Sequence, residues 1–422
     1  MNKKMLELGS NRSIIRELFE FSKEMKEIYG ENKVYDFSIG NPSVPTARVI
    51  DETAIDLLIN DKNIHGYTSS IGNNDVRSVI ASDLNDRYNT NYTKDNIYMT
   101  VGAAASITIA LHAVIESKNE EILALAPYFT EYKVFAEGTG AKFRAVPADM
   151  KNFSINFEAL DRYINENTKV IIVNSPNNPT GNIYSKEDLE KLADMLEAKE
   201  KEYKHDIYIL CDEPYREIVY DGIKLPHIPS IYHNTILCYS YSKSLSLPGE
   251  RIGYVLVSPR CNDSQNLMFA CLGAGRMLGY VCASSLYQKV IAKNPKALSD
   301  LSIYDENRKL LYNGLIKIGY ECVYPKGAFY LFVKALEEDS YSFMEHAKKY
   351  NIVLVPSDNF GVTGYMRLAY CVSKETIINS MDAFEKLFNE YKNKNMATCW
   401  VAIFFYSSRL LISSAIFFLD FI

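Results

Sequence analysis

Short apolar runs alternate with longer amphipathic stretches over most of this chain. Apolar or aromatic runs bounded by polar residues predict buried strands at 97–101, 121–126, 142–147, 168–173, 206–211, 235–239 and 253–257. Apolar positions three and four apart predict helices between them, at 75–88, 102–115, 129–137, 157–164 and 186–202. Such alternation is typical of a mostly parallel sheet covered by helices on both faces, so the pattern predicts an α/β fold.

The pattern changes towards both ends of the chain. Beyond a helix at 283–291, a mixture of elements predicts a smaller α+β domain, with helices at 298–318, 340–349 and 374–391 and strands near 352–355 and 365–370. Near the N-terminus, a helix at 11–29 precedes a short strand that stops at a Gly-Asn-Pro turn. We therefore expect four parts: an N-terminal segment that packs on the small domain, a large domain, a small domain and an apolar tail, at 1–50, 51–291, 292–395 and 396–422.

The tail differs from the rest of the chain because only Arg409 and Asp420 are charged between Trp400 and Ile422. Its length nearly suffices to span a bilayer, although Arg409 in its middle is costly there. Three interpretations stay open: a membrane anchor, a buried C-terminal element, or a segment foreign to the enzyme such as a frameshifted or fused extension. We favour the third, and we expect no membrane partner unless the tail is a native anchor.

Composition narrows the function classes. The 422 residues are 47% hydrophobic and 23% charged, as in ordinary globular proteins, and the net charge of −6 gives no basic surface for nucleic acid. The eight cysteines are scattered without a C-x-x-C pair, which favours a reducing compartment over disulfides or a zinc site. No long apolar run stands at the N-terminus, so we expect a cytoplasmic protein.

Polar stretches follow three successive strands of the predicted sheet. Asn178 follows the first, Asp212 and Tyr215 follow the second, and Lys243 follows the third. Ligands of such sheets bind outside the carboxyl ends of the strands. A lysine among small hydroxyl residues at that edge can lose its proton and attack a carbonyl group, although a solvated loop lysine is the alternative for each such position taken alone.

Two other stretches suit a ligand with a phosphate group. Ala103 and Ala104 follow Gly102 at a strand-to-helix turn, where free backbone N–H groups meet the positive end of a helix. Arg251, eight residues after Lys243, can supply a fixed cation. Gly40, in the early Gly-Asn-Pro turn, allows a ligand to approach the backbone closely, although it can also serve the turn alone.

Taken in order, these residues resemble those of the class I/II aminotransferases, which belong to the fold-type I family of pyridoxal 5′-phosphate (PLP) enzymes. The resemblance covers about residues 10–393, and four motifs carry it: Asn178-Pro179-Thr180-Gly181, Asp212-x-x-Tyr215, Ser240-x-Ser242-Lys243 with Arg251, and Tyr365-Met366-Arg367-Leu368. It implies a large domain with a mostly parallel sheet, a smaller α+β domain, and PLP as cofactor. The implied reaction moves an amino group between an L-amino acid, aspartate or another common one, and a 2-oxo acid such as 2-oxoglutarate.

The resemblance also implies roles around the cofactor ring. Lys243 is expected to bind PLP covalently and to move a proton, and Asp212 to keep the pyridine nitrogen protonated. Tyr215 and Asn178 are expected to hydrogen-bond the ring hydroxyl. Phe129 stands where many members have tryptophan, and is expected to stack on the ring.

The phosphate group would be held by Arg251, Ser240 and the backbone N–H groups of Ala103 and Ala104. Tyr67 matches a tyrosine that reaches the phosphate of the neighbouring subunit in the family, so a homodimer is implied.

The substrate side of the site is implied less completely. Arg367 is expected to bind the substrate α-carboxylate through two parallel hydrogen bonds, with Gly40 and Asn178 beside it. Arg276 is a candidate for a second carboxylate, but its surroundings match no motif, and a structural or dimer-interface arginine is the preferred interpretation.

Two alternatives to transamination stay open. A carbon–sulfur β-lyase can use the same fold and cofactor residues, because a fold does not fix a reaction. A regulatory module that binds PLP without catalysis is a further alternative. Two features argue against it: Lys243 and Arg367 are both present, and no DNA-binding extension is recognisable.

Overall fold

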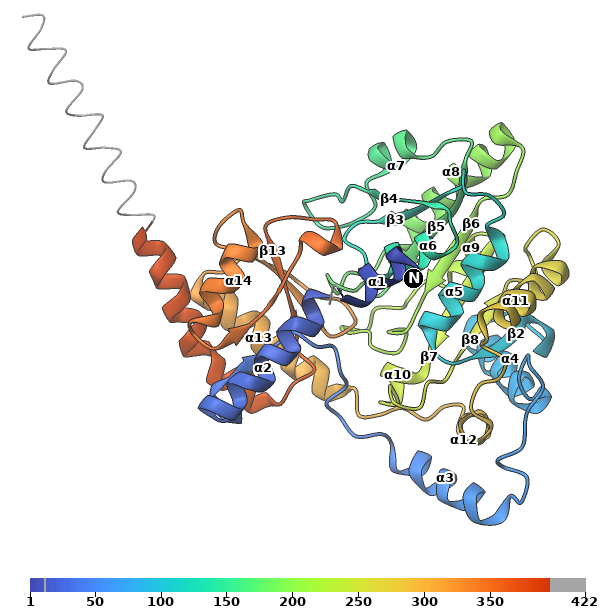
Figure 1. Cartoon of the computed structure of the whole chain (residues 1–422), viewed down its shortest axis with the longest axis horizontal. Helices are drawn as coiled ribbons and strands as arrows, with labels where there is room; N and C mark the ends of the chain where they lie inside the picture. The colour runs from blue at the N-terminus through green and yellow to red at the C-terminus, as the bar shows by residue number, and fades with distance from the viewer. Residues whose placement is uncertain (11–12, 395–422) are drawn as a thin grey trace, which may run out of the picture.

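The computed structural model of the chain describes residues 1–10 and 13–394 (Figure 1). The expectations for the tail at 396–422 therefore lie outside the described residues. Within those residues, none of the helices combines the length and the apolar character that crossing a membrane requires.

A seven-stranded sheet forms the centre of the larger of two lobes (Figure 1). The strand order is β2-β8-β7-β6-β5-β3-β4, and neighbours are parallel except where β8 pairs with β2 and β7. The predicted α/β fold with a mostly parallel sheet is thus confirmed. The strands are β2 Ile97–Thr100, β3 Glu121–Leu125, β4 Lys142–Val146, β5 Thr168–Asn174, β6 Tyr208–Asp212, β7 Thr235–Ser240 and β8 Gly253–Val257.

Both faces of this sheet are buried, because successive residues of each central strand pack into different apolar clusters. In β3, for example, Leu123 belongs to one cluster, whereas Ile122 and Ala124 belong to another. This two-sided burial explains why the strands appear as continuous apolar runs in the sequence. The helices of this lobe are α3 Arg48–Asn60, α4 Asn74–Tyr88, α5 Ala103–Val114, α6 Glu131–Gly138, α7 Phe157–Tyr163, α8 Lys186–Tyr203, α9 Ile228–Ile231, α10 Tyr241–Ser244, α11 Ser264–Leu278 and α12 Ser285–Lys293.

The smaller lobe is built on a four-stranded sheet with the order β12-β13-β10-β9. These strands are β9 Cys322–Val323, β10 Tyr330–Lys334, β12 Val355–Pro356 and β13 Tyr365–Ala369. Its helices are α2 Ile14–Tyr29, α13 Ser302–Ile318, α14 Ser340–Lys348 and a closing helix whose described part is 374–394. A third apolar cluster, with Phe329, Leu331 and Leu368 among its members, fills the space between these elements.

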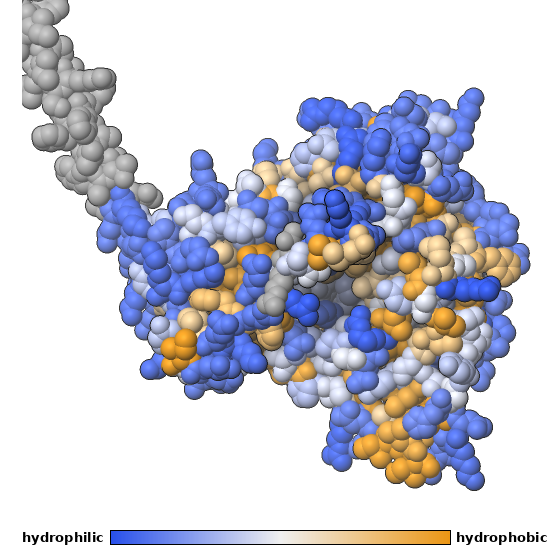
Figure 2. Space-filling model, in the orientation of Figure 1, coloured by the Kyte–Doolittle hydropathy of each residue, from blue (hydrophilic) through white to orange (hydrophobic). Residues whose placement is uncertain are grey.

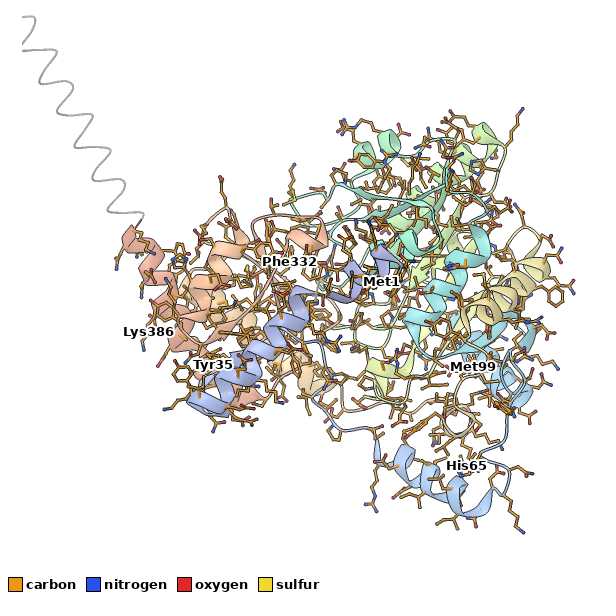
Figure 3. All side chains as sticks on the ribbon, viewed as in Figure 1. Met1, Tyr35, His65, Met99, Phe332 and Lys386 are labelled. Carbon is orange, nitrogen blue, oxygen red and sulfur yellow. The ribbon has the colours of Figure 1, made fainter. Side chains whose placement is uncertain are left out.

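The N-terminal segment joins the smaller lobe through a short parallel pair. Strand β1 (Tyr35–Asp36) pairs with β11 (Ile352–Val353), and Figure 3 shows Tyr35 in the same lobe as Phe332 of β10. This pairing is in line with the expectation that the N-terminal segment packs on the small domain. The bounds of the four expected parts stay a prediction. The first helix, α1 (Lys3–Ser10), lies near the larger lobe instead, where Lys4 bonds to the Glu137 carbonyl of α6.

Five of the described helices were not predicted from the pattern: α1, α3, α11 and the single turns α9 and α10. Helix α11 contains Gly273 and Gly275, although glycine is unfavourable in the interior of a helix. Packing explains it, because Gly275 lies against the Tyr98 ring, where an ideal Cβ would fall 2.1 Å from the hydroxyl oxygen. Short 3₁₀ turns at η1 Glu31–Lys33, η2 Lys94–Asn96 and η3 Asp358–Phe360 complete the fold.

Candidate active site

A cavity of about 300 Å³ opens at the carboxyl ends of β5, β6 and β7, where the surface is hollowed between the two lobes (Figure 2). Parallel neighbouring strands bring their last residues, Asn174, Asp212 and Ser240, to one edge of the sheet. The cavity brings together all the predicted site residues apart from Tyr67 and the candidate Arg276: Gly40, Ala103, Ala104, Phe129, Asn178, Asp212, Tyr215, Ser240, Lys243, Arg251 and Arg367.

Lys243 lies on α10, a single turn that begins directly after β7. The Ser240 hydroxyl caps this turn by accepting a hydrogen bond from the Ser242 backbone N–H at 3.2 Å. The Lys243 Nζ donates to the Gly40 carbonyl at 2.7 Å. Burial, supported by the positive charges of Arg367 and Arg251, lowers the pKa of Lys243 to about 8. A lysine with this pKa loses its proton near neutral pH much more readily than a solvated one, as a nucleophile toward carbonyls must.

The two carboxylate oxygens of Asp212 have different surroundings. Oδ2 accepts a short hydrogen bond from the Tyr132 hydroxyl of α6, whereas Oδ1 is buried without a hydrogen-bond partner among the described residues. Burial raises the pKa of Asp212 to about 7, the hydrogen bond from Tyr132 lowers it, and the neighbouring Glu213 charge raises it. A buried acceptor without a partner is costly, so Oδ1 is suited to a ligand that brings a positively charged N–H group.

Asn178 and Tyr215 come from rigid segments beside Asp212. The backbone N–H of Asn178 donates to the Asn174 side chain at 2.7 Å, which fixes the turn after β5. The Tyr215 hydroxyl lies 2.9 Å from the hydroxyl of Tyr330 on β10. Both side chains are buried and line the cavity, so they can hydrogen-bond a ligand held between Lys243 and Asp212.

A guanidinium lies against the N-terminus of α5. Gly102, with φ +97°, forms the cap of this helix, and an ideal Cβ there would fall 2.9 Å from the Arg251 Nη2. Glycine therefore permits the close approach of Arg251 to the free N–H groups of Ala103 and Ala104. The positive end of a helix and a guanidinium repel each other unless an anion lies between them, and this arrangement is suited to a phosphate.

Arg367 of β13 is a buried cation on the opposite side of the cavity. Its side chain donates a short hydrogen bond to the Ser38 carbonyl and another to the Asn178 Oδ1 at 3.3 Å, whereas its Nε has no partner among the described residues. Neither acceptor is a carboxylate oxygen. A buried charge without an opposite charge is costly, so this guanidinium is suited to an anionic ligand.

Two candidates lie outside the cavity of this chain. Tyr67, in the loop between α3 and α4, is 99% exposed. Arg276 lies on the exposed side of α11 and does not line the cavity. Its candidate role in binding a second carboxylate is therefore not supported by the geometry of its own chain.

Two cavity-side tyrosines were missed from the sequence. Tyr132 bonds Asp212, and Tyr330 bonds Tyr215 and lines the cavity. Tyr132 lies three residues after Phe129, a spacing that would place both on one side of the helix predicted at 129–137. In the structure α6 begins only at Glu131, and the two rings pack edge-on with centres 5.6 Å apart. That spacing was the one available signal, but an aromatic residue at helical spacing usually belongs to the core.

Together, these features define a site for a phosphorylated aldehyde cofactor. The activated lysine fits the carbonyl of PLP, and the unpartnered carboxylate oxygen fits its ring nitrogen. The buried phenol and the neighbouring amide fit the ring hydroxyl, and the positively charged turn fits the phosphate. The class of protein that these features fit is therefore a PLP enzyme, with a further buried arginine, Arg367, in the same cavity.

Comparisons with known proteins identify the family. The profile of the family "Aminotransferase class I and II" matches residues 32–384. The chain is 31% identical over 396 residues to aromatic-amino-acid aminotransferase 2 of Thermococcus litoralis, and equally identical to aspartate aminotransferase of Pyrococcus abyssi, covering 90% of this chain and 97% of each relative. A crystal structure of an aminotransferase from Eubacterium rectale has 52% identity and a TM-score of 0.91, covering 93% of this chain and 99% of that one.

The chain belongs to the class I and II aminotransferases. The family depends on PLP, and this chain is accordingly a PLP-dependent enzyme that moves an amino group between an amino acid and a 2-oxo acid. The three relatives described above are all named aminotransferases, so nothing in these comparisons favours the β-lyase alternative.

Proposed function

We propose that this aminotransferase uses aspartate or an aromatic L-amino acid as amino donor and 2-oxoglutarate as acceptor. The observation that carries the proposal is Arg367, which is 2% exposed, lacks a carboxylate partner among the described residues and lines the same cavity as Lys243. A guanidinium can hold an α-carboxylate through two parallel hydrogen bonds, and both substrates of a transaminase carry that group. The names of the two archaeal relatives suggest the donor side chains.

We assign the roles around the cofactor as the resemblance implies them. When bound, PLP supplies an electron sink that lets the amino group leave one substrate and join the next. Lys243 holds the cofactor and its Nζ removes the proton from the substrate Cα, while Asp212 holds a proton on the ring nitrogen. Tyr215 and Asn178 orient the ring hydroxyl.

The remaining residues orient the cofactor and the substrate. Phe129 packs against the ring, and Arg251 holds the phosphate together with Ser240 and the N–H groups of Ala103 and Ala104. Gly40 lies beside the substrate.

We also propose a cytoplasmic homodimer in which Tyr67 completes the partner's site. The surface near Tyr67 supports this arrangement, because α3 exposes Val49, Ile55, Leu58 and Ile59, which appear as an orange patch at the lower edge of the larger lobe (Figure 2). Contiguous exposed apolar side chains of this kind mark an interaction surface, and a second copy of the chain is the occupant that Tyr67 requires.

A single-substrate experiment tests the reaction. The PLP-loaded enzyme is mixed with one amino acid and no 2-oxo acid, over a panel of aspartate, glutamate, alanine, phenylalanine and tyrosine. We expect one equivalent of the corresponding 2-oxo acid per site, together with loss of the absorbance of the bound aldehyde cofactor. Cystathionine is added to the panel because its Cβ carries a thiolate leaving group. Continued release of pyruvate, ammonia and the thiol from cystathionine, without loss of that absorbance, would instead indicate a lyase.

The same experiment tests the role of Lys243. We expect Lys243→Ala to abolish the release of 2-oxo acid, with turnover at least 10³-fold lower, because its Nζ is the proposed base. The matched control is Lys186→Ala, since Lys186 is exposed on α8, where it pairs with Glu190. Unchanged turnover in Lys243→Ala would overturn the assignment of the whole site.

A further inference from the structure

Tyr330 contacts two parts of the proposed site at once. It begins β10, is 3% exposed, and lines the cavity. Its hydroxyl lies 2.9 Å from that of Tyr215, and the Arg367 Cζ lies 4.8 Å from the centre of its ring. It is therefore in contact with the proposed cofactor side and with the proposed carboxylate side of the cavity.

The pairing of two strands explains this position. Phe332 of β10 is the register partner of Arg367 on β13, and Tyr330 lies two residues before Phe332. Residues two apart point to the same face of a sheet, so Tyr330 and Arg367 are diagonal neighbours on one face, within reach of an aromatic ring. The ring thus supports a guanidinium that has no carboxylate partner among the described residues, through a cation–π contact.

Gly40 makes room for the hydroxyl of Tyr330. An ideal Cβ at Gly40 would fall 2.1 Å from the Tyr330 hydroxyl oxygen, so only glycine allows the two residues to be this close. The Gly40 carbonyl in turn accepts the hydrogen bond from the Lys243 Nζ. The tyrosine hydroxyl therefore lies in the same contact group as Lys243 and Tyr215.

We propose that Tyr330 is a positioning residue with two separable functions: its ring holds Arg367 in place for the substrate carboxylate, and its hydroxyl transmits carboxylate binding to Tyr215. The inference rests on the proposed role of Arg367. A carboxylate that neutralises Arg367 changes the electric field at the Tyr330 and Tyr215 hydroxyl groups. Because these two hydroxyl groups are hydrogen-bonded, the change reaches the residue that is proposed to contact the cofactor.

The electrostatic surroundings agree with this coupling. Burial raises the pKa of Tyr215 well above its ordinary value, the Tyr330 and Asp212 groups raise it further, and the charge of Arg367 lowers it. Burial raises the pKa of Tyr330 to about 12, against the charge of Arg367. Cys371 also raises the pKa of Tyr330. In the same contact group, Cys371 raises the pKa of Lys243, whereas Arg367 and Arg251 lower it.

Two substitutions separate the functions. Tyr330→Phe keeps the ring and removes only the hydroxyl, whereas Tyr330→Leu removes both. The probes are maleate and 3-phenylpropanoate, unreactive carboxylates titrated into the PLP-loaded enzyme. Two quantities are measured: the dissociation constant of each probe, and the pH midpoint of the cofactor absorbance with and without the probe.

We expect Tyr330→Leu to raise the dissociation constant of both probes about tenfold, because it loses a desolvated cation–π contact. Tyr330→Phe is expected to keep that constant within about twofold, but to lose most of the change in pH midpoint that the probe causes in the wild type. The matched control is Tyr232→Phe, which removes a fully buried hydroxyl that donates to the Ile207 carbonyl at 2.7 Å, and it should leave both quantities unchanged.

Failure of this inference can be told from failure of the proposed function. If Arg367→Gln weakens probe binding whereas both Tyr330 variants behave as the wild type, the positioning role of Tyr330 is overturned and the carboxylate site stands. If Arg367→Gln leaves probe binding unchanged, the proposed carboxylate site itself is overturned. Tyr330→Phe retains the buried ring, so the coupling stays testable even where Tyr330→Leu folds poorly.

Discussion

Asp212 combines a buried carboxyl group with one strong hydrogen bond and one unpartnered oxygen. The pKa of about 7 is far above that of an unfolded aspartate, so the folded protein without cofactor keeps Asp212 protonated up to a much higher pH than the unfolded chain does. The contribution of Asp212 to stability is therefore present below pH 4 and is lost as the pH rises through about 7. A ligand with a positively charged N–H group opposes this loss, because it stabilises the ionised form.

Tyr132 controls this balance, since its hydrogen bond is the interaction that lowers the pKa of Asp212. We expect Tyr132→Phe to raise the pKa of Asp212, and with it the pH midpoint for tight PLP binding. The expected shift is about one pH unit, because the free energy of one hydrogen bond to a charged group corresponds to about one pKa unit. The measurement is the dissociation constant of PLP from the reconstituted enzyme between pH 5 and 9. Tyr184→Phe, at another buried tyrosine that makes no contact with Asp212, serves as control. A midpoint that stays at the wild-type pH would refute the role of Tyr132.

The sequence was sufficient for the first contacts around the proposed cofactor but not for the residues behind them. Lys243, Asp212 and Asn178 could be predicted to lie together because polar stretches that contain them follow three successive apolar strands, and a parallel sheet brings those strand ends to one edge. Tyr132 and Tyr330 could not, because a tyrosine in an apolar element has the same sequence pattern whether its hydroxyl reaches a carboxylate or only a backbone carbonyl. Their partners lie 80 and 115 residues away along the chain, a separation that no local pattern encodes.

In the proposed function, the turn between β2 and α5 binds the cofactor phosphate without using a side chain of its own. Ala103 and Ala104 offer only backbone N–H groups, and Arg251 completes the cradle because Gly102 leaves space for it. The conformation at Gly102, with φ +97°, is itself one that other residues rarely adopt. The proposed binding of the phosphate thus depends on the backbone geometry at Gly102 as well as on the Arg251 side chain.

Gly102→Ala tests this dependence. We expect the added methyl group to displace the Arg251 guanidinium and to raise the dissociation constant of PLP about tenfold, the effect of weakening one charge-assisted contact. Pyridoxal, which lacks the phosphate, should bind with less than twofold change, and that difference is the diagnostic measurement. Gly273→Ala on α11 is the control, because an ideal Cβ there meets nothing within 4 Å. Equal losses for PLP and pyridoxal would show that the turn does not act through the phosphate.

At the scale of the whole molecule, the sequence predicted the order of elements better than their arrangement. Apolar runs indicated each strand of the large sheet, but they carry no information on direction, so the antiparallel position of β8 between β2 and β7 could not be foreseen. Helix α3 was missed for a related reason. Much of its apolar side faces away from the core, so the pattern that marks a helix packed on its own domain is incomplete there.

That exposed side of α3, together with the exposed Tyr67, has a consequence for how the enzyme is assembled. If each site takes Lys243 from one subunit and Tyr67 from the other, a mixed dimer of a Lys243→Ala chain and a Tyr67→Ala chain contains one site with both substitutions and one with neither. Each variant alone has only impaired sites: Lys243→Ala lacks the proposed base, and Tyr67→Ala is expected to bind PLP about tenfold more weakly, because it loses a phosphate contact.

Mixing the two variants under conditions that exchange subunits should therefore restore up to a quarter of the wild-type specific activity at a PLP concentration that leaves Tyr67→Ala mostly empty. Random pairing makes half of the dimers mixed, and each has one intact site of two. The control mixture contains Lys243→Ala and Tyr341→Ala chains, so that both variants keep Tyr67. Tyr341 is an exposed tyrosine of the smaller lobe. Homodimers of Tyr341→Ala should behave as the wild type before mixing, so mixing should produce no gain. If the first mixture shows only the average of its two components, Tyr67 acts within its own chain, and the shared site is wrong.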